Sequence, residues 1–140
     1  MKFLYRYYYT FFLLHLKDNQ TGKNKSPAWL STLIQVGFGI GALVLNIVMI
    51  VSTLFGGQFV NRIQPNKFVV GLIVFIIPTT ILYYLLYDYY GVSKQSGLTP
   101  NDNFIVTPRT KAFFWIFWIV SLLGLLILGR LIKTSGFNFN

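Results

Sequence analysis

Cysteine and glutamate are both absent from the 140-residue chain, which has only three aspartates and one histidine. Without cysteine the chain forms no disulfide and offers no thiolate as a metal ligand or nucleophile. One histidine and three carboxylates are too few for acid/base or metal chemistry. Charged residues make up 11% of the chain, against about 25% in a soluble domain. These shortages exclude a soluble globular enzyme, and we expect no catalytic residue, no metal and no cofactor.

Apolar residues dominate what is present: 54% of the chain is hydrophobic and 19% aromatic. Three runs carry no charge, at residues 26–61, 68–87 and 112–129. A helix needs about 20 apolar residues to cross a bilayer, so each run is long enough to cross once. Gly56 and Gly57 predict that the first helix ends near Phe55. The sequence therefore predicts an all-α integral membrane protein with transmembrane helices at residues 28–56, 67–90 and 108–133.

Polar loops are expected between these helices, at residues 18–27 and 91–107, because both segments are rich in turn formers. Asn66 is a candidate N-cap for the second helix. Thr99-Pro100 and Thr107-Pro108 both place a capping threonine before a proline that suits the first turn of a helix. Of the two, we expect the third helix to begin at Pro108.

Residues 1–17 predict an amphipathic helix that lies in the membrane interface, since about 24 Å of helix is too short to cross. On a helical wheel, polar and apolar side chains separate, as expected of a helix at headgroup depth. The polar side has Lys2, Arg6, Thr10 and Lys17, and the opposite side has Leu4, Tyr8, Phe11 and His15. His15 is expected to contact lipid headgroups.

The basic residues predict the orientation of the three spans. Eight lie on the side of the N-terminal segment and the second loop (Lys2, Arg6, Lys17, Lys23, Lys25, Lys94, Arg109, Lys111), and four on the other side (Arg62, Lys67, Arg130, Lys133). This bias places the N terminus in the cytoplasm and the C terminus outside. A bacterial inner membrane is the first expectation and an organellar inner membrane the second.

The net charge of +9 does not predict nucleic-acid binding, because the cations flank the spans on both sides of the membrane. They favour contact with anionic lipid headgroups. Asp88, among five tyrosines at the end of the second span, is expected at the interface, in an ion pair with Lys94 or Arg109. Pro78 interrupts the same span and predicts a kink.

The first span has two candidate packing faces. Gly37 and Gly41 form a G-x-x-x-G pair, which lets another helix approach closely. The opposite side is polar, and Gln35 and Asn46 lie only about 20° apart on it. Amides need hydrogen-bond partners inside a membrane, so we predict that both face protein. The candidate interaction residues are Gln35, Gly37, Gly39, Gly41, Asn46 and Thr53.

A non-enzymatic role follows as the expected function: an accessory or structural subunit that binds other membrane subunits through its helices. Its partners would be anionic lipid and further subunits, or copies of itself in a homo-oligomer, and no nucleic acid. Two alternatives stay open. One is a small oligomeric transporter or channel with a path lined by Gln35, Asn46 and Thr53. The other is a holin-like pore former.

Overall fold

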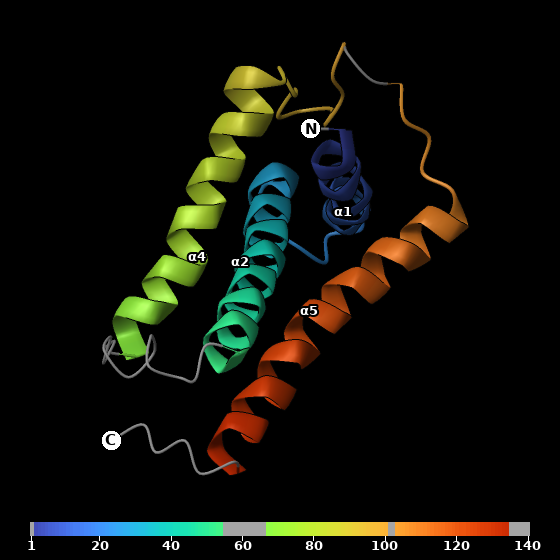
Figure 1. The fold of residues 1–140 in the computed structure, drawn as a ribbon. Coiled ribbons are helices and arrows are strands. Elements are labelled where there is room, and N and C mark those ends of the chain that lie inside the picture. The colour runs from blue at the N-terminus through green and yellow to red at the C-terminus, as the bar shows by residue number, and fades with distance from the viewer. Residues whose placement is uncertain (1, 55–66, 101–102, 135–140) are drawn as a thin grey trace.

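A computed structural model describes residues 2–54, 67–100 and 103–134. Within these residues the chain is all-helical, which confirms the predicted class, and it contains no strand. The elements are α1 (Lys2–Gln20), α2 (Ala28–Leu54), α4 (Lys67–Tyr83), the π-helical segment η1 (Tyr84–Tyr89) and α5 (Pro108–Thr134) (Figure 1).

Two helices are long and apolar enough to cross a membrane. These are α2, over Ala28–Val51, and α5, over Pro108–Ile127. Only 33% and 11% of their most apolar windows are buried inside the protein, so most side chains of these windows are at least partly exposed. This exposure favours a membrane location over the interior of a soluble protein. α4 has 17 residues, and its role as a third span is taken up below as a proposal.

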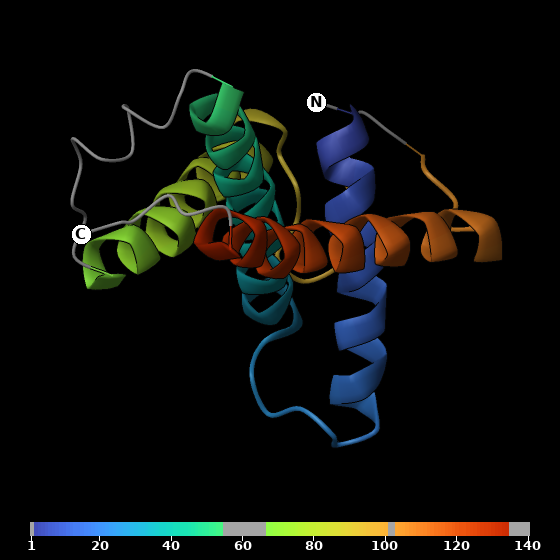
Figure 2. The ribbon, with the colours of Figure 1, turned by 60° about the horizontal axis from the view of Figure 1, so that its bottom comes forward.

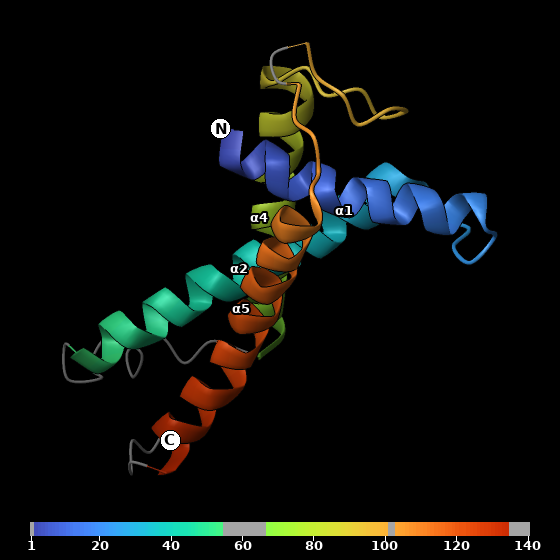
Figure 3. The same cartoon turned by 90° about the vertical axis from the view of Figure 1, so that its right-hand side faces the viewer.

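α2 is the central helix and packs against α1, α4 and α5. α4 and α5 flank it in Figure 1, whereas α1 runs across α5 (Figures 2 and 3). The beginning of α1 lies between the end of α4 and the beginning of α5 (Figure 1). The C-terminal ends of α2 and α5 lie apart from each other at the other end (Figure 3).

The buried core lies at the end where α1 crosses. Its largest members come from α1: Tyr5, Tyr7, Tyr8, Phe11 and Phe12. They belong to one cluster with Leu82 at the end of α4, Leu86 of η1, Tyr90, and Phe114 of α5. The aromatic rings contact each other directly, as in the stacking of Tyr7 on Phe114 at 5.2 Å between centroids. Such pairs add about 0.5–1.5 kcal/mol beyond the burial of their area.

This packing corrects the expectation for the N-terminal helix. Tyr8 and Phe11, expected against lipid, are 0% and 1% exposed because protein covers them. Thr10, expected on the polar side, is also buried and donates its hydroxyl to the carbonyl of Arg6 at 2.8 Å. A helical wheel assumes one wet and one apolar side. Here α1 has neighbouring helices on more than one side, so polar and apolar positions are covered together.

The second predicted span is helical from Lys67, but its last turn differs from a regular α-helix. After Tyr83 the chain forms η1, and the amide of Tyr90 then donates to the carbonyl of Leu85 at 3.1 Å. π-helical turns are rare in α-helices and frequent at functional sites. α4 continues through Pro78 without a break in the helix, and the kink expected there stays a prediction.

Local signals place the start of α5 at Pro108, the expected residue. The hydroxyl of Thr107 accepts a hydrogen bond from the amide of Thr110 at 3.2 Å, as an N-cap does. Thr99 begins no helix; its hydroxyl donates to the carbonyl of Tyr90 at 2.8 Å. Asn66, the other candidate cap, lies outside the described residues.

Candidate functional site

Asn46 joins the central helix to α5. Its side chain is buried, and Nδ2 donates to the backbone carbonyl of Ser121 at 2.8 Å. Gly124 makes room for the amide, since a Cβ at that position would lie 2.6 Å from Nδ2. The hydroxyl of Ser121 in turn donates to the carbonyl of Phe117. The amide therefore fits a site made by the backbone of α5.

Gln35 is held by two other helices. Its Oε1 lies 2.7 Å from Nε2 of His15 on α1, and its backbone carbonyl accepts a hydrogen bond from the indole of Trp118 on α5 at 3.2 Å. This corrects the expectation that His15 contacts headgroups, because the ring bonds a half-buried amide instead. Both amides of α2 thus have partners within the chain. The hydrogen bonds that they make join α1, α2 and α5.

The glycines of α2 face different neighbours. Gly37 contacts Thr79 of α4 so closely that a Cβ there would overlap the Thr79 hydroxyl and lie 3.1 Å from its Cα. Gly39 faces the other way, toward Tyr7 of α1 and Trp118 of α5. Gly41 is buried. The side chain of Thr53, the last candidate on α2, lies outside the described residues.

A lysine from the loop after η1 lies among aromatic rings. The ammonium of Lys94 is 5.0 Å from the centre of the Trp29 ring, 4.8 Å from that of Tyr83 and 5.3 Å from that of Tyr87. It also donates to the Tyr83 hydroxyl at 2.7 Å. The expected ion pair with Asp88 does not form among the described residues, and Asp88 is exposed at the end of η1. The aromatic rings attract the lysine through their negatively charged faces.

Two tyrosines connect α1 to η1. The hydroxyls of Tyr8 and Tyr87 lie 2.5 Å apart. Burial, and then the hydrogen bond to Tyr87, raise the pKa of Tyr8 far above its ordinary value. Burial also raises the pKa of Tyr7. The hydroxyls of Tyr7 and Tyr8 therefore stay protonated to a higher pH than that of an ordinary tyrosine.

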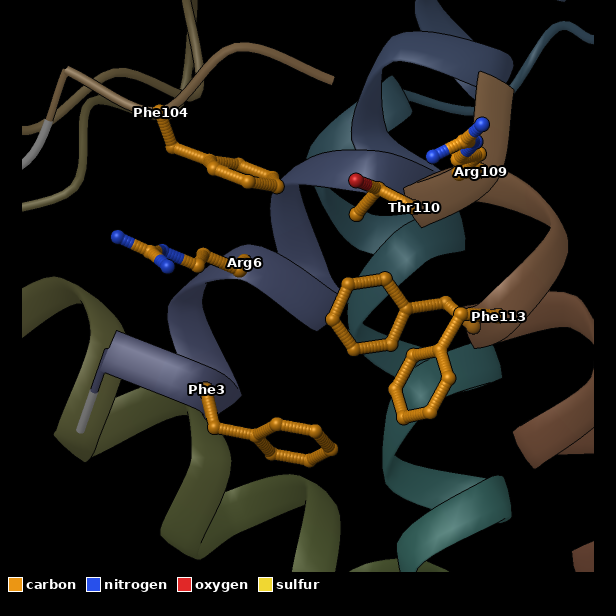
Figure 4. A pocket seen from close by; sticks show the side chains of 7 residues that line it. Phe3, Arg6, Phe104, Arg109, Thr110 and Phe113 are labelled. Atoms are coloured by element: carbon orange, nitrogen blue, oxygen red, sulfur yellow. The ribbon is translucent and has the colours of Figure 1, made fainter. Parts of the chain in front are cut away.

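A pocket of about 460 Å³ opens between the start of α1, the start of α5 and residues 103–107. Arg6 of α1 and Arg109 of α5 flank it from opposite sides in Figure 4, with rings of phenylalanine between them. The Arg6 guanidinium lies over the ring of Phe104, 4.9 Å from its centre. None of the described lining residues is acidic. The pocket therefore combines positive charge with an apolar wall.

Among the residues that the structure describes, no three His, Cys, Asp or Glu side chains gather as metal ligands would. The polar contacts described above join helices, and none pairs a nucleophile with a base. No family model, curated protein or solved structure matches the chain.

Three features were not predicted: the aromatic surroundings of Lys94, the Tyr8–Tyr87 contact and the pocket between the two arginines. Each joins residues from distant parts of the chain. The only signal in the sequence is the density of aromatic residues in two segments, residues 3–12 and 83–90.

Proposed function

We propose that this chain is a three-span integral membrane protein that acts without catalysis, as a small subunit of a larger membrane complex. In this proposal α2, α4 with η1, and α5 cross the membrane, and α1 lies across them at the cytoplasmic end. Lys67–Tyr89 adds up to 23 residues, from 17 in α4 and 6 in η1, which is enough to cross about 30 Å of hydrocarbon.

The observation that carries the proposal is the exposed apolar surface beyond Asn46 and Ser121. Past these two residues, no described side chain of α2 or α5 is buried. The exposed side chains there are large and apolar: Ile47, Val48, Ile50, Val51, Leu54, Leu123, Leu126 and Ile127. Each helix thus ends in an exposed apolar surface, and large apolar surfaces are rarely exposed on soluble monomers. Lipid or the helix of another subunit would cover it.

The partner would bind this half of α2 and α5, because the amides that were candidates for a mating surface already bond within the chain. The same contacts remove support from a path lined by Gln35 and Asn46, and nothing in the described residues favours a channel or a pore former. A partner helix on the exposed half would pack mainly through van der Waals contact, as helices do in lipid.

Purification in mild detergent tests the proposal. We expect a defined larger assembly with the chain at a fixed stoichiometry. A matched pair of variants locates the contact: Leu126→Trp changes the exposed half of α5, whereas Ile116→Trp changes another exposed position, in the half of α5 before Ser121. Only Leu126→Trp should release the partner. Recovery of the chain alone, or as a homo-oligomer unaffected by Leu126→Trp, would contradict a subunit role.

Orientation needs a separate test. The eight-to-four distribution of basic residues supports a cytoplasmic N terminus and an external C terminus. A reporter that is active only outside the cytoplasm should be active when fused after Asn140 and inactive when fused after Lys94. The reverse pattern would invert the topology, and equal activity at both sites would mean an even number of crossings between them.

A further inference from the structure

The pocket between Arg6 and Arg109 has features that favour an amphipathic anion. Guanidinium groups bind phosphate through paired hydrogen bonds and keep their charge at any physiological pH. Phe3, Phe104 and Phe113 line the same space (Figure 4). At about 460 Å³ the pocket falls within the usual range for small-molecule sites, about 300–1,000 Å³. A small inorganic anion would leave the aromatic wall without a contact.

The surface of α5 continues the apolar wall away from the pocket. Phe113, Ile116, Val120, Leu123 and Ile127 recur at helical spacing, and each is 48% to 61% exposed. Spacings of three and four residues place them on one side of the helix. From the first to the last, at 1.5 Å per residue, this stripe is about 21 Å long, which exceeds half the roughly 30 Å of hydrocarbon in a bilayer.

The position of the pocket suits a lipid in the proposed topology. It lies where α1 meets the start of α5, at the end that is cytoplasmic in the proposed topology, and α5 runs from there toward the other end (Figure 1). The start of α5 adds the positive end of a helix dipole, which also favours an anion. A headgroup in the pocket would have its acyl chain beside the stripe.

We propose that this pocket binds the phosphate headgroup of an anionic phospholipid, with one acyl chain along the α5 stripe. The inference rests on the proposed membrane location and adds a defined lipid site to it. Arg109 contacts the phosphate, Arg6 adds positive charge on the opposite side of the pocket, and the phenylalanines contact the glycerol and the first methylenes. Free phosphate shares the charge but has no chain for the stripe.

Native mass spectrometry of the purified, delipidated protein tests the site with phosphatidylglycerol and, as the neutral comparison, phosphatidylcholine. Phosphatidylglycerol should be retained at least fivefold more. Arg109→Gln should reduce its retention about fivefold, because Arg109 lines the pocket. Lys111→Gln removes the same charge two residues away, at another exposed position outside the pocket, and should change retention less than twofold.

Two further arms separate the sources of phosphate and the role of the stripe. Glycerol 3-phosphate at millimolar concentration should compete weakly; if it displaces the lipid completely, the site binds free phosphate and the lipid assignment is wrong. Val120→Ser, in the stripe, should lower retention, whereas Val44→Ser, exposed on α2, should not. Equal losses for Arg109→Gln and Lys111→Gln would mean general attraction of anionic lipid, which overturns the proposal.

Resistance to extraction by alkaline carbonate is measured on the same variants. Proteins that stay in the membrane fraction but bind no lipid would refute the pocket while leaving the membrane location intact. Wild-type protein that is extracted would refute the location itself.

Discussion

Gly124→Ala should loosen the contact between α2 and α5 by displacing the amide of Asn46. The new Cβ would lie 2.6 Å from Nδ2 and 3.0 Å from Cγ of Asn46. The side chain must then rotate, and its 2.8 Å bond to the carbonyl of Ser121 breaks. Loss of an interhelical bond costs about 0.6 kcal/mol, up to about 1.7, and crowding adds only about 1, the lower end of its range, because the amide can rotate away. Alanine regains up to about 1 kcal/mol of helix propensity, which leaves a net loss of about 0.6–2.7 kcal/mol.

The same substitution should cost nothing when Asn46 is already alanine. In Asn46→Ala the atoms nearest the new Cβ are gone, so Gly124→Ala becomes neutral or stabilises the fold by up to about 1 kcal/mol through propensity. The two changes are therefore coupled by about 1–3 kcal/mol, within the range known for residues in contact. Asn46→Ala alone should cost about 0.6–2 kcal/mol, because only one of its amide atoms is bonded: Oδ1 has no partner among the described residues.

Reversible unfolding in mixed micelles measures the free energies of unfolding of the wild type, the two single variants and the double variant. Fluorescence of the tryptophans, two of which lie on α5, is the signal. Val120→Ala is the control partner for Asn46→Ala, since Val120 is exposed on α5; that pair should be additive within about 0.5 kcal/mol. If Gly124→Ala and Asn46→Ala are equally additive, the amide does not occupy the space beside Gly124 and the reasoning fails.

Three other perturbations test the contacts around α1 and α4. Burial raises the pKa of Tyr8 in the folded state. The contribution of Tyr8 to the free energy of unfolding should therefore be constant below about pH 10, the pKa of an unfolded tyrosine, and decrease at higher pH. In alkaline unfolding Tyr8→Phe should lose less stability than the wild type, and an equal loss would contradict this. Lys94→Met should destabilise by about 0.5–2 kcal/mol and change the fluorescence of Trp29, whereas an unchanged spectrum would argue against the ring contact. Gly37→Ala should separate α2 from α4 at a cost of about 1–3 kcal/mol. It should also slow disulfide formation between cysteines placed on the two helices. Adding Thr79→Ala should restore part of this rate if the Thr79 hydroxyl is the obstacle.

Local chemistry explains which parts of the fold could be predicted. The start of α5 depends on Thr107 and Pro108 alone, and both act within one turn. The charge-free runs likewise contain α2 and all of α4 except its first residue, Lys67. No such local pattern predicts the change from α-helix to η1, because a π-helical turn needs no residue type or hydropathy that differs from those of an α-helix.

The candidate site was predicted from the hydrogen bonds that its amides require, and not from the positions of their partners. Amides in an apolar helix need partners, which singles out Gln35 and Asn46. Which groups supply them depends on where the other helices lie, so the carbonyl of Ser121 and the ring of His15 could not be inferred. Arg6 and Arg109 are 103 positions apart in the sequence, and only the crossing of α1 over α5 brings them to one pocket.

Burial divides α2 into two halves at Asn46. Hydropathy is high along the whole helix and predicts no difference between its ends. All described buried side chains of α2 lie at or before Asn46, where the helix contacts α1, α4 and α5, whereas no described side chain beyond Asn46 is buried. Polar contacts are concentrated in the covered half, so its structure is specified within the chain. The exposed side chains of the other half are large and aliphatic, so we expect its neighbours to be selected mainly by shape and apolar contact. Substitutions before Asn46 should therefore change stability, and substitutions beyond it should change association.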